Sequence, residues 1–182
     1  MPGARIARGD RVALRTAEAE DVEFLQRGSA NAELRYPLGS RLLNREQVEE
    51  VVLDDGEDQF LVCLDGDDAG PGTPADDAVE RIGFVAVQDV DWKRPELVYW
   101  LVPEVHGEGY GREAVALVLD YVFRTYDAPA VEAGAYAFND ASRGLLESLG
   151  FEEEGRLRKR RFVDGEHVDS IVYGLLREEW HD

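Results

Sequence analysis

The feature that most restricts the fold is an apolar run followed by a glycine-rich turn and an amphipathic helix, within residues 96–122. Residues 96–102 (ELVYWLV) are almost all apolar, which predicts a central strand buried on both faces that ends at Pro103. A strand that leads through a tight turn into a helix favours a layered fold of helices on a sheet. The helix is indicated by an apolar stripe at helical spacing, formed by Ala114, Leu117, Val118, Tyr121 and Val122.

Patterns along the rest of the chain predict further strands and helices around this unit. Thr16 is typical of a helix cap, and Gly28 of a helix end. Asn44 with Gln47 three residues later indicates a capping box at the start of a second helix, which residues 54–56 (DDG) would end. The fold class is therefore α/β (α+β), with helices around one mixed sheet. The other expected strands are residues 11–15, 60–64, 81–88, 131–137, 151–163 and 167–176, the last two joined by a turn at 164–165, and the other expected helix is 139–149.

The length indicates a single domain. With 182 residues and 20.4 kDa, residues 1–182 fit one unit with a substantial core. Residues 65–78 contain Asp, Gly and Pro but nothing apolar larger than Ala, so we expect a flexible acidic loop between two strands.

The charge restricts the partners. Twenty Lys and Arg against 39 Asp and Glu leave a net charge of −19, which repels phosphate backbones and anionic lipids. We therefore expect neither nucleic-acid nor membrane binding. Only two of the cations are lysines, and such an acidic, lysine-poor surface resembles halophilic proteins from high-salt cytoplasm. An ordinary acidic cytosolic protein is the alternative.

The cysteine count, the lengths of the apolar runs and the histidine spacing exclude several further classes of protein. The single cysteine, Cys63, lies in an apolar run and excludes an internal disulfide framework. No apolar stretch approaches ~18 residues, and the first residues are not followed by a secretory h-region. Three scattered histidines show no metal-ligand spacing. These observations predict a cytoplasmic protein without a metal.

The glycine turn is a candidate anion site. Gly107, Gly109 and Gly111 lack Cβ atoms, so the backbone can approach a phosphate and adopt positive φ. The first N–H groups of the following helix have no internal partner and carry partial positive charge. A flexible connector is the alternative interpretation. Neither the P-loop pattern nor the dinucleotide G-x-G-x-x-G fits, because no lysine follows and the third glycine place is Arg112.

The turn does resemble the [Q/R]-x-x-G-x-[G/A] acetyl-CoA loop of the GNAT acetyltransferases, with His106 at its first place and Gly109 and Gly111 at its glycines. The likeness extends through most of the chain and is strongest to the RimJ/RimL-type branch. The segments that carry it are 96–101 (ELVYWL), 139–142 (NDAS), 147–151 (ESLGF), 154–157 (EGRL) and 164–169 (DGEHVD), followed by 177–180 (REEW).

This resemblance implies a single GNAT-like domain with a mostly antiparallel sheet. Strands 96–102 and 131–137 would splay apart around the pantetheine of acetyl-CoA. The backbone of Leu101 and Val102 would hold the pantetheine or polarise the thioester carbonyl. The pyrophosphate would bind the turn residues His106, Gly107, Glu108, Gly109, Tyr110, Gly111 and Arg112.

The resemblance also implies roles at the start of helix 139–149. Asn139 would contact the pantetheine arm, and Ser142 would place a hydroxyl near the departing sulfur. Simple helix capping explains one of the two equally well. Many relatives carry a Tyr for the sulfur at the place of Leu146, which has no proton to donate. Thiolates are adequate leaving groups near neutral pH, so Ser142, water or unaided departure remain open.

A proton acceptor for the attacking amine is harder to assign. Glu96 is the candidate, acting directly or through water, and a solvated acid at a strand end is its alternative. Tyr99 and Tyr136 are interpreted either as cleft lining or as core. The basic run Arg156–Arg161 is either a solvated hairpin or a docking site for an acidic substrate or a subunit. Strand alternation predicts that Arg156, Arg158 and Arg160 lie on one face and that Lys159 and Arg161 lie on the other.

The predicted function is transfer of an acetyl group from acetyl-CoA to a primary amine. The acceptor would be a small amine or a protein N-terminus of the ribosomal type, and the branch implies a homodimer. A non-catalytic CoA-binding sensor or scaffold of the same fold is the alternative, and a different nucleotide-binding domain is a third interpretation.

Overall fold

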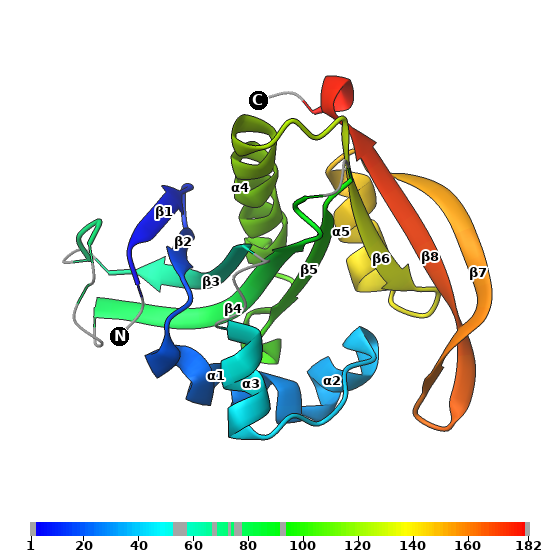
Figure 1. Ribbon diagram of the computed structural model, residues 1–182, viewed down its shortest axis with the longest axis horizontal. Coiled ribbons are helices and arrows are strands. Elements are labelled where there is room, and N and C mark those ends of the chain that lie inside the picture. The colour runs from blue at the N-terminus through cyan, green and yellow to red at the C-terminus, as the bar shows by residue number, and fades with distance from the viewer. Residues whose placement is uncertain are drawn as a thin grey trace.

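The protein folds around one eight-stranded mixed sheet with the strand order β1-β2-β3-β4-β5-β6-β8-β7 (Figure 1). The computed structural model describes residues 3–52, 58–66, 69–72, 74, 78–91 and 94–180. Among these residues only the β5–β6 pair is parallel, so the expected mixed, mostly antiparallel sheet is confirmed. The strands are β1 (Arg5–Arg8), β2 (Ala13–Thr16), β3 (Asp58–Asp65), β4 (Val79–Gln88), β5 (Glu96–Leu101), β6 (Ala130–Tyr136), β7 (Glu152–Val163) and β8 (Glu166–Leu176).

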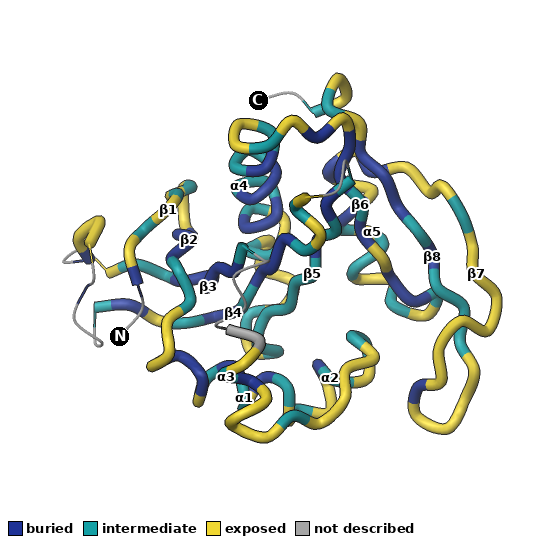
Figure 2. The backbone as a smooth tube through the Cα atoms, viewed as in Figure 1, coloured by how far each residue is buried: buried dark blue, intermediate teal, exposed yellow. Residues whose placement is uncertain are grey.

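Helices cover both faces of the sheet. Helices α4 and α5 pack on one face, and α1, α2 and α3 lie on the other (Figure 1). Buried residues gather along the central strands and the inner side of α4, whereas most of β7 is exposed (Figure 2). The helices are α1 (Val22–Ala30), α2 (Ala32–Leu38), α3 (Arg45–Val52), α4 (Tyr110–Thr125) and α5 (Asp140–Ser148).

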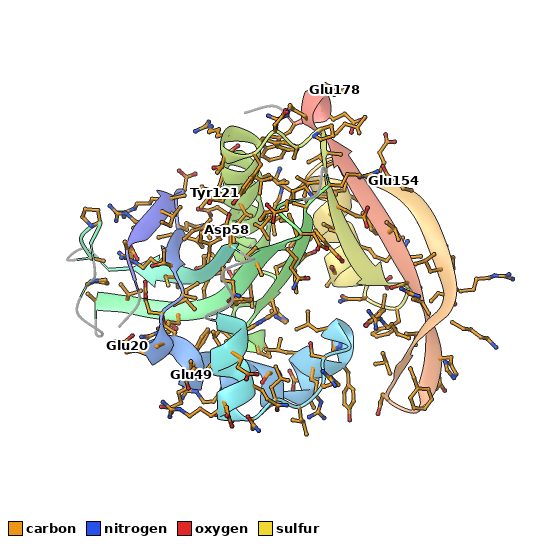
Figure 3. All side chains as sticks on the ribbon, viewed as in Figure 1. Glu20, Glu49, Asp58, Tyr121, Glu154 and Glu178 are labelled. Carbon is orange, nitrogen blue, oxygen red and sulfur yellow. The ribbon has the colours of Figure 1, made fainter. Side chains whose placement is uncertain are left out.

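The face under α4 and α5 holds the larger core. Three predicted positions of the α4 stripe are buried, namely Ala114, Val118 and Val122, and Val115 and Leu119 are buried with them. The other two predicted positions, Leu117 and Tyr121, are only half-buried. The C-terminal part of α4 is tied to the start of β3, because Tyr121 donates to Asp58 Oδ2 at 2.8 Å (Figure 3). Tyr126 donates to the same oxygen. These bonds fix the direction of α4 and thus the position of the turn that precedes it.

The opposite face holds a smaller core beneath α1 and α3. It includes Cys63, which is buried as expected, and burial raises the pKa of its thiol to about 12. Such a thiol stays protonated at neutral pH, so Cys63 acts as a small core residue.

Strands β5 and β6 diverge along their length (Figure 1). Among the described residues, their register contains only Glu96↔Glu132 and Leu97↔Ala133, so the two strands separate beyond those pairs. The prediction that residues 96–102 are buried on both faces is wrong. Only Leu97 is buried and the other residues of β5 are half-buried, because the strand borders this opening.

The N-terminal region differs from the prediction in three places. Thr16 ends β2 instead of capping a helix, and α1 begins only at Val22. Gly28 lies inside α1, where a Cβ atom would come within 2.3 Å of the Trp100 ring. This glycine therefore permits close helix-to-sheet packing and does not end the helix. Strand β1 and helix α2 were not predicted, while the Asn44–Gln47 capping box is confirmed.

The β7–β8 hairpin confirms the predicted turn but not the predicted alternation of basic side chains. Asp164 and Gly165 both have positive φ, as a tight two-residue hairpin turn requires. The β7–β8 register shifts between Leu157 and Arg161, and Lys159 has a φ of 51°. The Asp169 carboxylate holds this irregularity by accepting from Arg156 Nε at 2.7 Å and from the Lys159 N–H at 2.8 Å.

Part of the expected flexible loop is attached to the sheet. Arg15 is fully buried and its guanidinium donates to Asp65, to the Gly70 carbonyl at 2.9 Å and to the Gly72 carbonyl at 3.0 Å. The loop residues 67–68, 73 and 75–77, and the predicted end of α3 at 54–56, lie outside the described residues. No described helix is long and apolar enough to cross a membrane.

Candidate active site

Four element ends converge where β5 and β6 are far apart. The carboxyl ends of both strands and the amino ends of α4 and α5 meet there (Figure 1). Clefts at the carboxyl ends of diverging parallel strands are the usual ligand sites of layered α/β folds. The arrangement therefore places the glycine turn at the mouth of the β5–β6 opening.

The turn has the backbone geometry of an anion cradle. Gly107 and Gly109 have φ values of 83° and 85°, a region that side-chain-bearing residues rarely adopt. A Cβ atom on Gly107 would meet no atom within 4 Å, so the space above this glycine is open. Gly109 is the N-cap of α4, which runs for 16 residues and directs its dipole at the turn.

The amides of the turn are available. The His106 N–H donates to the Pro103 carbonyl, but no described residue accepts a hydrogen bond from the N–H groups of residues 107–112. Arg112 is exposed at the start of α4 and adds a full positive charge beside them. Residues 107–112 therefore keep their N–H groups open to an anion, whereas the His106 N–H is already used.

A distant arginine fixes this turn. Arg11, between β1 and β2, donates from Nη1 to the Glu108 carbonyl at 2.8 Å, and its guanidinium lies 4.7 Å from the centre of the Tyr110 ring. Glu113 Oε1 accepts from the Arg11 and Val12 N–H groups at 2.7 and 3.1 Å. Burial raises the pKa of Glu113, but these hydrogen bonds outweigh it and lower the pKa overall. The sequence contains no local signal for this contact, because its partners are about 100 residues apart.

The His106 ring turns back onto β5. Its Nε2 lies 2.8 Å from the Leu101 carbonyl, and because a carbonyl only accepts, Nε2 carries the proton. His106 is thus engaged with its own strand. The side chain therefore makes a contact that closes the turn.

The backbone that faces the opening comes from Tyr99 and Leu101. The Val102 N–H donates to the Ile82 carbonyl at 2.8 Å, so it points toward β4 and is not available in the opening. Alternate residues of an antiparallel strand direct their backbone groups to the same neighbour, so Tyr99 and Leu101 point toward β6. The expectation that the Val102 backbone holds the pantetheine is therefore corrected, because its N–H is bonded to β4.

Two hydroxyls meet beside the opening. Tyr99 Oη and Ser142 Oγ are 2.8 Å apart, joining β5 to the first turn of α5. Burial raises the pKa of Tyr99 to about 12, so its hydroxyl stays protonated at neutral pH. Whichever hydroxyl donates in this pair, the other retains a proton for a further hydrogen bond.

The capping interpretation of Asn139 is confirmed. Its Oδ1 accepts from the Ser142 N–H at 3.1 Å and so caps α5. This cap holds Ser142 at the helix start, in reach of Tyr99. Leu146 is fully buried in the core of the α4–α5 face and supplies no proton.

Glu96 lies at the closed end of the opening and on the other face of the sheet from Tyr99. The register Gln88↔Glu96, Ala86↔Val98 and Phe84↔Trp100 puts its side chain on the α1 face, because side chains alternate along a strand. Glu96 is half-buried, and its Oε1 lies over Gly134 of β6. Burial, and next the charges of Glu132 and Asp89, raise its pKa, which Arg161 partly offsets.

A turn with positive-φ glycines at the mouth of two diverging strands is the arrangement that the sequence resemblance implied. The chain belongs to the acetyltransferase (GNAT) domain family, which it matches over residues 11–152. Membership makes it an acetyl-CoA-dependent acyltransferase, as the resemblance implied.

Similar proteins extend over nearly the whole chain. N-acetyltransferase YokL from the SPbeta prophage of Bacillus subtilis (strain 168) is 29% identical over 183 residues, covering 94% of this chain and 93% of YokL. Spermidine N-acetyltransferase from Vibrio cholerae, solved with CoA and spermine, has a TM-score of 0.79 at 21% identity and covers 94% of this chain and 98% of its own. RimL, a ribosomal L7/L12 alpha-N-protein acetyltransferase solved with CoA, has a TM-score of 0.78 at 16% identity, covering 96% and 99%.

Proposed function

We propose that this protein transfers an acetyl group from acetyl-CoA to a primary amine while both are bound. The observation that carries the proposal is the turn 107–112, whose amides and positive helix end lie at the mouth of the β5–β6 opening. The diphosphate of acetyl-CoA would bind this turn through backbone N–H groups and Arg112. When bound there, acetyl-CoA supplies the reactive thioester.

The divergent part of β5 would position the pantetheine. Tyr99 and Leu101 turn backbone groups into the opening, where they can pair with amides of an extended ligand as a neighbouring strand would. The Leu101 N–H is the proposed donor to the carbonyl oxygen that gains negative charge during transfer. Asn139 borders the same opening and keeps its side-chain NH₂ for the pantetheine arm.

Ser142 and Tyr99 would stabilise the departing sulfur. One proton of the pair remains free to hydrogen-bond the thiolate. With a pKa of about 12, Tyr99 is a much weaker acid than an ordinary thiol, so the pair acts mainly by hydrogen bonding and not by complete proton transfer.

Glu96 would accept the proton that leaves the attacking amine. A raised pKa makes its carboxylate a stronger base than an ordinary glutamate. Glu96 and Tyr99 are three positions apart on β5, about 10 Å along the strand, so a chain of water molecules would carry the proton.

The acceptor is a small primary amine or a protein N-terminal amine. Structures of the same fold include both kinds of enzyme, a spermidine N-acetyltransferase and a ribosomal-protein N-acetyltransferase. The test is mass spectrometry of amine and peptide mixtures incubated with acetyl-CoA, at low and at high salt. We expect one acetyl group on a primary amine, and no mass gain on any acceptor would favour a CoA-binding sensor.

We further propose that the protein works in a salt-rich cytoplasm, as a homodimer. The net charge of −19 supports the first point, because concentrated salt screens the repulsion among carboxylates. The melting temperature should then rise steadily from 0.1 M to 3 M KCl. Light scattering coupled to gel filtration measures the mass and tests the dimer.

A further inference from the structure

A pocket of about 180 Å³ lies between α1, α2 and α3 and the sheet. Its sheet wall comes from β3, β4 and β5, including Phe84, Val98 and Trp100. Trp100 packs against two other aromatic rings, since the Phe24 ring of α1 stacks on it with 5.4 Å between ring centres and the Phe84 ring lies 6.3 Å away. The pocket is thus a fixed feature of the packing between α1 and the sheet.

The pocket adjoins the opening on the face opposite the glycine turn and α5. Val98 and Trp100 flank Tyr99 along β5, beyond the last residues that pair with β6. On the β6 side, Tyr136 donates to the carbonyl of Leu38, which also lines the pocket, at 3.4 Å. Glu96 projects from the same face, one position beyond Val98 in the alternation.

The lining is mostly apolar, and none of the described lining residues is charged. Leu25, Leu38, Leu43 and Val48 face the aromatic rings of the sheet wall. The polar side chains among the described lining residues are Ser29, Ser40, Gln59 and Gln88, and none of them carries a charge. A second ammonium group placed here would lose its hydration without gaining a counter-charge.

We propose, on the basis of the proposed transferase function, that this pocket binds the apolar part of the acceptor. The preferred acceptor is then a primary amine that bears one aromatic ring or branched aliphatic group a few bonds from its nitrogen, and not a polyamine. The volume suits one such group, since an apolar cavity of about 150 Å³ accommodates benzene. With the group in the pocket, the amine nitrogen lies toward Glu96 and the opening.

An acceptor series tests the proposal. We compare kcat/KM for 2-phenylethylamine, 3-methylbutylamine, ethanolamine and spermidine at saturating acetyl-CoA. Short peptides beginning with Phe or Gly form a second arm, which shows whether the apolar group is best supplied by a small amine or by the first side chain of a peptide. Calorimetric titration of 2-phenylethylamine and ethanolamine into the CoA-saturated protein measures binding without turnover.

A variant in which a larger side chain fills the pocket provides the decisive test of the pocket's role. Ser29→Leu adds a larger side chain from α1 and removes a hydroxyl that donates to the Gln26 carbonyl at 2.9 Å. Ser148→Leu is the matched control, because its hydroxyl makes the same contact to the Leu145 carbonyl at 2.7 Å on α5, away from the pocket. Ala86→Leu fills the pocket from β4 and serves if Ser29→Leu does not fold.

We expect the two apolar amines to exceed ethanolamine and spermidine by about 100-fold in kcat/KM. Ser29→Leu should lower the 2-phenylethylamine-to-ethanolamine ratio at least tenfold, in kcat/KM and in binding, while Ser148→Leu leaves it unchanged. A preference for spermidine, or an unchanged ratio in both filled variants, would overturn the pocket assignment alone. Failure to acetylate any amine would overturn the proposed function and this inference together.

Discussion

The hydroxyl of Tyr99 lies 2.8 Å from the hydroxyl of Ser142, so strand β5 and helix α5 are joined where they border the β5–β6 opening. The bond depends on Asn139, which caps α5 and sets the position of Ser142. Tyr99 is anchored by its strand, and Ser142 by its helix. A hydroxyl pair of this kind is preorganised to hydrogen-bond a sulfur that gains negative charge.

Removal of either hydroxyl should slow the transfer step. We expect Ser142→Ala and Tyr99→Phe each to lower kcat about tenfold, a modest effect because a thiolate leaves readily without help. The double variant should cost little more than either single one, because the two hydroxyls act as one unit. Steady-state kinetics measure kcat, and calorimetry with CoA provides the control, which should be unchanged. Full activity in the double variant would remove the pair from the mechanism.

Arg11 should control the affinity for acetyl-CoA without touching the reacting atoms. Arg11→Ala frees the Glu108 carbonyl and loosens the turn, so we expect the Kd for CoA to rise about tenfold while kcat at saturation changes little. Arg8→Ala removes the same charge from an exposed position on the neighbouring strand β1 and is the matched control. Equal effects of the two variants on Kd would mean that Arg11 acts only through the net charge.

Glu96 should act as a base whose ionisation costs the fold some stability. Because its pKa is raised in the folded protein, ionised Glu96 destabilises the fold above that pKa and has no such effect when protonated. Glu96→Gln should therefore leave the melting temperature equal or higher at pH 8, with the difference vanishing below about pH 4. The same variant should lower kcat about 100-fold. A kcat within twofold of wild type would leave Glu96 a solvated strand-end acid.

The buried Arg15–Asp65 pair should be essential for stability. The side chains are 0% and 3% exposed, and Arg15 Nη2 lies 2.8 Å from Asp65 Oδ2. Burial raises the pKa of Asp65, but the hydrogen bonds from Arg15 and Arg5 outweigh it and lower the pKa overall. Asp65→Asn should cost about 3–5 kcal/mol in the free energy of unfolding at pH 7. Denaturant titrations should show that cost shrinking below pH 4, as wild-type Asp65 protonates, and a pH-independent difference would contradict this role.

Local sequence patterns predicted most of the helices, strands and turns because these elements are determined by residues close together in the sequence. The helix 110–122 has an apolar stripe, the Asn44–Gln47 box caps α3, and the turn 164–165 has residues that tolerate positive φ. The predictions of secondary structure failed where contacts between distant residues determine the local structure. Gly28 is inside a helix because Trp100 packs there, and the short helix α2 contains Pro37, which argues against a helix when read locally.

At the candidate site, local sequence patterns account for the backbone geometry of the turn and not for the long-range contacts around it. The glycine turn carries its own backbone requirement, so the positive φ of Gly107 and Gly109 was foreseeable from the sequence, while anion binding by residues 107–112 stays a prediction. The Arg11 contact and the turned-back ring of His106 depend on long-range packing, and no local pattern encodes them. The direction of the Val102 N–H follows from strand register, which an isolated strand sequence does not determine.

Calorimetric titration of acetyl-CoA into the wild-type protein and into Gly109→Val tests the central claim most directly. Gly109 has a φ of 85° that valine does not tolerate, whereas Gly155→Val, at a glycine of ordinary φ with no atom within 4 Å of the added Cβ, is the matched control. We predict micromolar binding to the wild type and to Gly155→Val, and at least tenfold weaker binding to Gly109→Val. Equal affinity in all three proteins, or no binding to the wild type, would contradict the account.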